Sequence, residues 1–191
     1  MGTDPIQAKA ELRRLVRAAR TSRVPPIGEA QAFAAGALDC IGDASLPVAT
    51  YLAMSNEPPT SAIIERLGAA LVPRTTTRDA ILEWVAYRPG DPLHRSRLGM
   101  DEPLGAAVGS GSAPLLACSA VVVPSLAIDA RGRRLGQGGG YYDRVLADVP
   151  REIPIITLLF DEEILEDVHA ETHDAQVDVC VTPTRTLRFS R

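Results

Sequence analysis

The sequence lacks the features that mark membrane-spanning, secreted and nucleic-acid-binding proteins. No apolar run approaches the roughly 18 residues of a membrane span, and residues 1–20 are charged, without the apolar stretch of a secretory signal. The formal net charge is −4, whereas nucleic-acid-binding domains are usually basic. We therefore expect a cytoplasmic protein with neither nucleic acid nor membrane as a partner, and we expect it to act as a monomer.

Cysteine is scarce as well. The three cysteines are far apart and have no metal-ligand spacing, so free thiols in a reducing compartment are expected. With 191 residues, of which 46% are hydrophobic, the chain is long enough for one domain with a substantial core. We expect a single α/β domain over residues 1–191.

Glycine, in contrast, is concentrated in one stretch. Residues 133–144 read Arg-Arg-Leu-Gly-Gln-Gly-Gly-Gly-Tyr-Tyr-Asp-Arg, with four glycines within five residues and arginines on both sides. The apolar, β-branched run at 120–124 predicts a buried strand before this stretch, and the apolar spacing after it predicts a helix from Tyr141. Backbone N–H groups at a helix start favour an anion, and arginines can add bidentate phosphate contacts.

The stretch does not match the common phosphate-binding motifs. It lacks the Gly-Lys-Ser/Thr of a Walker A loop, and its alternating glycines do not give Gly-x-Gly-x-x-Gly. A flexible glycine hairpin would explain a glycine run taken alone. Such a hairpin does not need two tyrosines, an acid and several arginines beside it, so these residues favour a nucleotide-phosphate site of another kind.

Three consecutive segments, 122–129, 132–136 and 138–144, resemble the signature of the 5-formyltetrahydrofolate cyclo-ligase (5,10-methenyltetrahydrofolate synthetase) family. The resemblance implies a three-layer αβα sandwich with a mostly parallel sheet, of the NagB/RpiA/CoA transferase-like type. Further matches follow the family's order along nearly the whole chain. They are Lys9 and Arg13, then Tyr51, Glu57 and Thr60, the segment 98–103, and finally His173, Asp174, Asp178 and Thr182.

Periodicity predicts elements that are compatible with such a fold. Helices are expected over 5–20, 28–41 and 61–71, strands over 46–53, 81–87, 120–124 and 153–160, a helical turn at 161–164, and a loop over 88–114. In the first helix we expect an apolar face made by Ile6, Leu12, Leu15, Val16 and Ala19. The same helix is expected to expose three side chains to solvent, those of Arg14, Arg17 and Arg20.

The resemblance also implies a reaction. 5-Formyltetrahydrofolate would be cyclised to 5,10-methenyltetrahydrofolate, with ATP as co-substrate and Mg²⁺ as cofactor. ATP would phosphorylate the formyl oxygen, and ADP and phosphate would be released. Phosphoryl transfer depends mostly on positioning and charge neutralisation, so no covalent nucleophile is required.

The family's functional residues are carried over where the sequence matches. ATP contacts are implied for Lys9, Arg13, Arg134, Gly136, Gln137, Gly138, Gly139, Gly140, Tyr141 and Tyr142. Substrate contacts are expected from Tyr51, Glu57, Trp84, Gly138 and Tyr142. Mg²⁺ is expected at Asp143 and Asp178, which offer hard oxygen ligands. Catalytic roles are expected for Arg134, Arg144 and Tyr142.

Several of these residues also have simpler interpretations. Glu57 suits a solvated turn, Trp84 suits a core position, and one of the two adjacent tyrosines suits core packing. Gln137 stands where relatives often have an aromatic or basic residue, and Gly139 stands where some have lysine. Two other functions therefore stay open: a paralogue that acts on another formylated amine, and a nucleotide- or folate-binding module without turnover.

Overall fold

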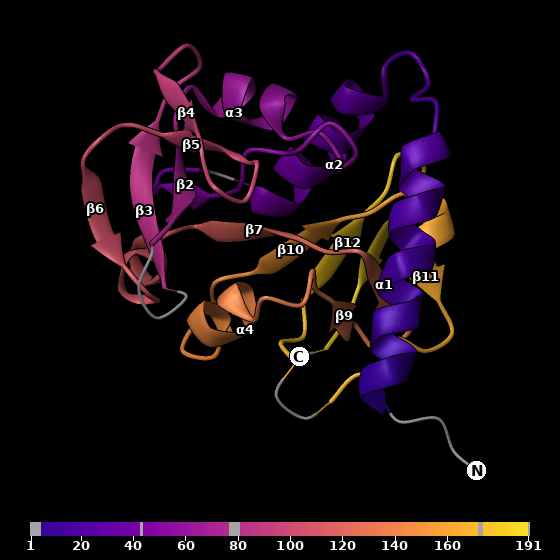
Figure 1. The fold of residues 1–191 in the computed structure, drawn as a ribbon. Coiled ribbons are helices and arrows are strands. Elements are labelled where there is room, and N and C mark those ends of the chain that lie inside the picture. The colour runs from indigo at the N-terminus through magenta and orange to yellow at the C-terminus, as the bar shows by residue number, and fades with distance from the viewer. Residues whose placement is uncertain (1–4, 43, 77–80, 172–173, 191) are drawn as a thin grey trace.

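The centre of the computed structural model, which describes residues 5–42, 44–76, 81–171 and 174–190, is an eight-stranded sheet. Its order is β13-β12-β10-β7-β1-β2-β3-β6 (Figure 1). The strands from β12 to β2 pair in parallel, and the outer strands pair antiparallel. The strands are β1 (Val48–Ala49), β2 (Ala70–Thr75), β3 (Leu82–Tyr87), β6 (Ala107–Ser110), β7 (Ala120–Pro124), β10 (Ile155–Leu158), β12 (Val179–Val181) and β13 (Thr186–Arg188).

Helices cover both faces of this sheet (Figure 1). The helices α2 (Glu29–Ile41) and α3 (Ser61–Leu67) bury apolar residues against one face. The short helix α4 (Tyr141–Leu146) and the 3₁₀ turn η1 (Ala113–Ala117) pack in the core on the other face. Every residue of β10 is buried, as expected for a parallel strand covered on both sides. The predicted layered α/β fold with a mostly parallel sheet is confirmed.

The helix α1 (Pro5–Ser22) lies across the carboxyl ends of the central strands. Its residue Arg20 donates to the carbonyl of Ser125, directly after β7, and to Glu163 in the turn η2 (Asp161–Glu163), after β10. Strand carboxyl ends are where open α/β sheets bind ligands. Within the described residues, none of the helices combines the length and the apolar character that a membrane crossing requires.

Two small sheets complete the fold. One contains β11 (Ile164–Leu165), β8 (Ala127–Asp129) and β9 (Arg134–Leu135), and the other pairs β4 (Leu93–Arg95) with β5 (Asp101–Pro103). Strands β8 and β9 form an antiparallel hairpin between β7 and the glycine stretch. This hairpin packs on α1 through a small apolar cluster that includes Val16, Leu126 and Leu135. The glycines therefore begin beside α1, near the carboxyl ends of the central strands.

Two predictions about secondary structure are wrong. The helix expected over 61–71 ends at Leu67, because Gly68 takes a left-handed conformation with φ 74°, and the chain then forms β2. The loop expected over 88–114 contains β4, β5, β6 and η1. These strands have three or four residues each and pair antiparallel. Such short segments are too brief to show a clear hydrophobic period.

The buried face of α1 also differs from the prediction. Ile6 and Leu15 are 66% and 50% exposed, whereas Lys9 and Arg20 are both 4% exposed. Arg20 is therefore not a solvated residue: its guanidinium makes a bidentate pair with Glu163, at 2.6 and 2.8 Å. The expectation of a solvent-facing side chain is correct for Arg14, which is exposed and pairs with its neighbour Glu11.

Removing Arg20 should therefore destabilise the fold. The variant Arg20→Met keeps the aliphatic stem and leaves the buried carboxylate of Glu163 without its partner, which should lower the free energy of unfolding by about 3–5 kcal/mol. Urea denaturation of the purified protein measures this change. Arg14→Met is the matched control and should leave the unfolding midpoint nearly unchanged. Equal midpoints for the two variants would contradict a structural role for the Arg20–Glu163 pair.

Candidate functional site

The glycine stretch is a common wall of two cavities. The first, about 790 Å³, is lined by four basic residues, Lys9, Arg13, Arg144 and Arg151, and we call it the basic cavity. The second, about 500 Å³, is lined by Tyr51, Tyr141 and Tyr142, and we call it the tyrosine cavity. Both cavities are bordered by Gly136, Gly138, Gly140 and Asp143. Molecules bound on the two sides would meet at this stretch.

The glycines make room for arginine side chains. A Cβ atom at Gly136 would lie 2.9 Å from Nη1 of Arg134, and one at Gly140 would lie 2.9 Å from Nη1 of Arg144. Gly138 and Gly140 also have φ values of 100° and 66°, in the region that favours glycine. Larger residues would displace the guanidinium groups from the wall, so the glycines are needed for close packing as much as for backbone freedom.

Three cations of α1 approach this wall from one helical face. Lys9, Arg13 and Arg17 are spaced four residues apart and therefore point the same way. Arg13 donates from Nε to the carbonyl of Gly136 at 3.0 Å, and Arg17 donates from Nη2 to the carbonyl of Gln137 at 2.8 Å. The position of α1 thus fixes the first half of the glycine stretch.

Lys9 reaches the basic cavity with its charge retained. Its Nζ lies 2.7 Å from Oε2 of Glu171 and 2.5 Å from Oδ2 of Asp174. Burial lowers the pKa of Lys9, but the bonds to these two carboxylates outweigh burial and raise the pKa overall. The ammonium group therefore stays protonated and positioned beside the cavity.

An ion pair between buried Arg134 and partly exposed Asp143 joins the two ends of the glycine stretch. Nη2 of Arg134 lies 2.5 Å from Oδ1 of Asp143, which also accepts a bond from the backbone N–H of Ala175 at 3.2 Å. Asp143 is the acid that borders both cavities. Its Oδ2 atom makes no hydrogen bond to the described part of the chain, so this oxygen is available to a metal ion.

Two buried polar atoms of the tyrosine cavity have no hydrogen-bond partner within the described residues. They are Nε of Arg134 and the hydroxyl of Tyr142. Burial, followed by the nearby charge of Glu57, raises the pKa of Tyr142, so its phenol stays neutral and can donate. Buried polar atoms in folded proteins almost always have partners, and a ligand in the tyrosine cavity would supply them to these two atoms.

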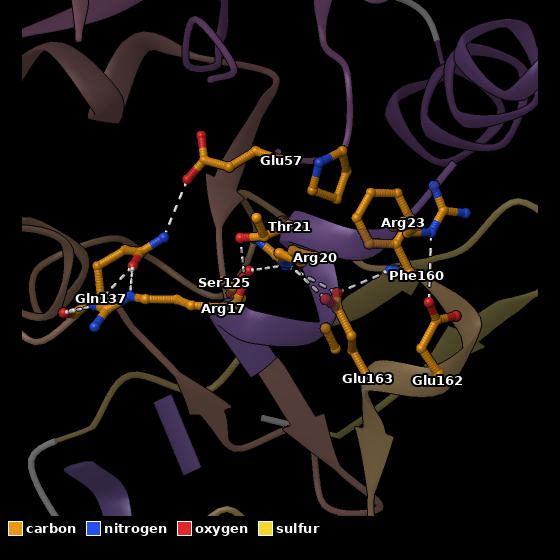
Figure 2. Close-up of polar contacts among 12 residues, drawn as sticks. Arg17, Arg20, Thr21, Arg23, Glu57, Ser125, Gln137, Phe160, Glu162 and Glu163 are labelled. Carbon is orange, nitrogen blue, oxygen red and sulfur yellow. Dashed lines mark hydrogen bonds and ion pairs between the residues drawn. The ribbon is translucent and has the colours of Figure 1, made fainter. Parts of the chain in front are cut away.

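Glu57 lies on the opposite wall of the tyrosine cavity, in the loop between β1 and α3. Its Oε2 accepts the backbone N–H of Met54 at 3.0 Å, and its Oε1 accepts Nε2 of Gln137 at 3.2 Å (Figure 2). Burial raises the pKa of Glu57, opposed by those two bonds and by the charge of Arg20. Glu57 is thus a buried, oriented carboxylate, and the interpretation as a solvated turn residue is wrong.

The structure brings most of the predicted residues to the two cavities. The basic cavity receives Lys9, Arg13, Gly136, Gly138, Gly140, Asp143 and Arg144. The tyrosine cavity receives Tyr51, Glu57, Arg134, Gly136, Gln137, Gly138, Gly139, Gly140, Tyr141, Tyr142 and Asp143. The segment 98–103 also contributes to the tyrosine cavity, as the resemblance implies, through Leu98, Met100, Asp101 and Glu102.

Two predicted residues are not among those that line either cavity in the described structure. Trp84 is fully buried in the core, and its indole N–H donates to the carbonyl of Gly111 at 2.9 Å. Its assignment as a substrate contact is withdrawn, because the ring is enclosed by the sheet's own packing. Asp178 accepts the backbone N–H of Ile155 at 2.8 Å, near the beginning of β12. The matched residue His173 lies outside the described residues.

Among the charged residues described at the two cavities, sequence reasoning missed three, namely Arg17, Arg151 and Glu171. The four-residue spacing from Lys9 and Arg13 could have identified Arg17. Arg151 and Glu171 come from separate turns, where no local pattern signals their convergence. The described residues contain no group of three or more His, Cys, Asp or Glu side chains suited to a metal.

Comparison with known proteins agrees with this geometry. The sequence pattern described as the 5-formyltetrahydrofolate cyclo-ligase family matches residues 5–183. A 5-formyltetrahydrofolate cyclo-ligase of Mycolicibacterium smegmatis is 30% identical over 94% of this chain and 95% of its own. One from Escherichia coli K12 is 29% identical, over 72% of this chain and 78% of its own.

Solved structures share the fold. The 5,10-methenyltetrahydrofolate synthetase of Aquifex aeolicus superposes with a TM-score of 0.74 at 23% identity, covering 96% of this chain and 94% of that one. The enzyme of the same name from Mycoplasma pneumoniae gives a TM-score of 0.66 at 17% identity, covering 91% and 97%. At such identities the superpositions establish the fold, and the match over residues 5–183 establishes the kinship. The chain therefore belongs to the 5-formyltetrahydrofolate cyclo-ligase family.

Proposed function

We propose that this protein cyclises 5-formyltetrahydrofolate to 5,10-methenyltetrahydrofolate, with hydrolysis of ATP to ADP and phosphate in the presence of Mg²⁺. The observation that carries this proposal is the glycine wall between the basic and tyrosine cavities. A nucleotide held in one cavity and a folate in the other would bring a phosphate and a formyl group together at the glycines that border both cavities.

The basic cavity suits the nucleotide. Lys9, Arg13 and Arg144 supply positive charge around it, and phosphoryl transfer is accelerated mainly by positioning and by neutralising phosphate charge. Gly136, Gly138 and Gly140 allow phosphates to approach the backbone closely. The cations are held before a nucleotide arrives, because Arg13 is bonded to Gly136 and Lys9 to two carboxylates.

The tyrosine cavity suits the folate. Glu57 is a carboxylate acceptor for the N–H groups of a pterin ring. The unpartnered hydroxyl of Tyr142 and Nε of Arg134 are donors for a carbonyl oxygen such as that of the formyl group. Donors at this oxygen would orient it toward the phosphate.

The reaction then runs in two steps. The formyl oxygen attacks the γ-phosphorus of ATP, an O–P bond forms, and the bond to ADP breaks, which leaves an iminophosphate. The nitrogen at position 10 attacks the formyl carbon and loses its proton, and the C–O bond breaks as phosphate leaves. Arg134 and Arg144 would hold the phosphoryl group between the cavities, and Tyr142 would hold the formyl oxygen.

Asp143 fits a magnesium site, whereas Asp178 does not fit the same site. Mg²⁺ commonly takes one or two carboxylates and completes its coordination with phosphate oxygens and water. Asp143 borders both cavities and keeps Oδ2 unbonded within the described residues, while Asp178 lines neither cavity and accepts the backbone N–H of Ile155, a residue of the basic cavity. When bound, the ion would neutralise phosphate charge.

The proposal predicts that turnover of 5-formyltetrahydrofolate depends on both ATP and Mg²⁺. Purified protein with 5-formyltetrahydrofolate should give a rise in methenyltetrahydrofolate absorbance only when both ATP and Mg²⁺ are present. Omission of either one is the control. A flat trace from folded protein that still binds ATP would exclude this substrate. A screen of other formylated amines would then separate a paralogue from a binding module without turnover.

The variant Asp143→Asn tests the magnesium assignment. The amide keeps an oxygen for Arg134 and Ala175 but removes the negative charge, so half-maximal rate should require on the order of 10- to 100-fold more Mg²⁺. Initial rates across a Mg²⁺ titration measure this shift. The control Asp148→Asn lies just beyond α4, where Asp148 is exposed and accepts from Ser112, and it should titrate like the unaltered protein. An unchanged titration for Asp143→Asn would remove Asp143 from the metal site.

A further inference from the structure

The side chain of Gln137 bridges α1 and the loop that follows β1 (Figure 2). Its Oε1 accepts from Nε and Nη2 of Arg17, at 3.2 and 3.0 Å, and its Nε2 donates to Oε1 of Glu57 at 3.2 Å. The backbone carbonyl of Gln137 accepts a further bond from Arg17 at 2.8 Å. One residue of the glycine stretch thus connects a cation of α1 to the acid of the tyrosine cavity.

The two partners fix the orientation of the amide. The guanidinium of Arg17 can only donate, and an ionised Glu57 can only accept. Both are satisfied when the amide oxygen faces Arg17 and the amide nitrogen faces Glu57, and the reverse orientation satisfies neither. A glutamate at this position would set two carboxylates against each other, and an aliphatic residue would leave both partners without this contact.

Few other groups control the carboxylate of Glu57. Its second oxygen accepts the backbone N–H of Met54. The charged side chain that acts on it is Arg20 of α1, and the charge of Glu57 in turn acts on Tyr51, beyond β1, and on Tyr142 of α4. Arg20 favours the carboxylate form, whereas burial opposes it. The Gln137 amide therefore contributes a direct bond to an oxygen that is otherwise poorly supported.

We propose that Gln137 is a positioning residue that holds Glu57 ionised and directed at the pterin ring. The proposal rests on the proposed function, since it assigns the pterin to the tyrosine cavity. It also replaces the ATP contact that the resemblance implies for Gln137, because within the described residues Gln137 lines the tyrosine cavity and not the basic cavity. The nucleotide side would receive only the backbone of this stretch.

The variant Gln137→Leu distinguishes the positioning role toward Glu57 from the ATP contact. Loss of the bond to Glu57 should raise the KM for 5-formyltetrahydrofolate on the order of 10-fold, with the KM for ATP and kcat nearly unchanged. The pKa of Glu57, already raised by burial, should rise further without this donor. Glu57 would then be protonated at a higher pH, so the acid limb of the kcat/KM profile for the folate should move to higher pH.

Two further variants complete the comparison. Glu57→Gln should remove that acid limb altogether, because the titrating group is gone. Gln31→Leu is the matched control: Gln31 is exposed on α2, and its replacement should change neither KM nor the pH profile. A Gln137→Leu protein whose KM for ATP rises as much as its KM for the folate, with an unmoved acid limb, would overturn the proposal and restore the nucleotide contact.

A measurement without substrate keeps this proposal separate from the proposed function. Carboxyl ¹³C NMR of the ligand-free protein can follow the titration of Glu57, with the resonance assigned by its loss in Glu57→Gln. The Glu57 pKa should be higher in Gln137→Leu than in the unaltered protein. This result together with no turnover of 5-formyltetrahydrofolate would retain the contact and reject the substrate. Equal pKa values in the two proteins would reject the positioning role.

Discussion

The buried pair between Arg20 and Glu163 sets the geometry on which both cavities depend. Its bidentate bonds, together with the bond from Arg20 to Ser125, hold α1 against the carboxyl ends of β7 and β10 (Figure 2). Buried pairs of this kind contribute more to a unique arrangement than to net stability. With the end of α1 fixed, helical periodicity alone directs Arg17, Arg13 and Lys9 toward the glycine stretch.

The second constraint is steric. Guanidinium groups approach this stretch so closely that a Cβ atom at Gly136 or Gly140 would lie 2.9 Å from one of them. The glycines thus act by exclusion of side chains, and they leave a thin wall of backbone between a cavity rich in cations and a cavity with a buried carboxylate. In the proposed reaction the two bound molecules would have to meet at the glycines that border both cavities, since reacting atoms must lie within roughly 3–3.5 Å.

The parts of the site that could be predicted from the sequence are those encoded locally. The strand at Ala120–Pro124 and the helix that begins at Tyr141 follow from neighbouring residues, and both are found as expected. Burial of a polar side chain is decided by distant partners. Arg20 is buried by a glutamate 143 positions away, and nothing near it in the sequence distinguishes it from the exposed Arg14. The assignment of Trp84 as a substrate contact is wrong for the same reason, because the residues that bury its ring come from other strands.

The proposed two-sided site also explains how one loop can vary without loss of phosphate chemistry. Under this proposal phosphates would approach the backbone of the glycines, which is independent of the side chain at position 137. That side chain instead extends to Glu57. A change there would alter the acid proposed to face the substrate, while the basic cavity keeps its cations. Divergence of substrate preference at position 137 would then need no change in the residues proposed to hold the nucleotide.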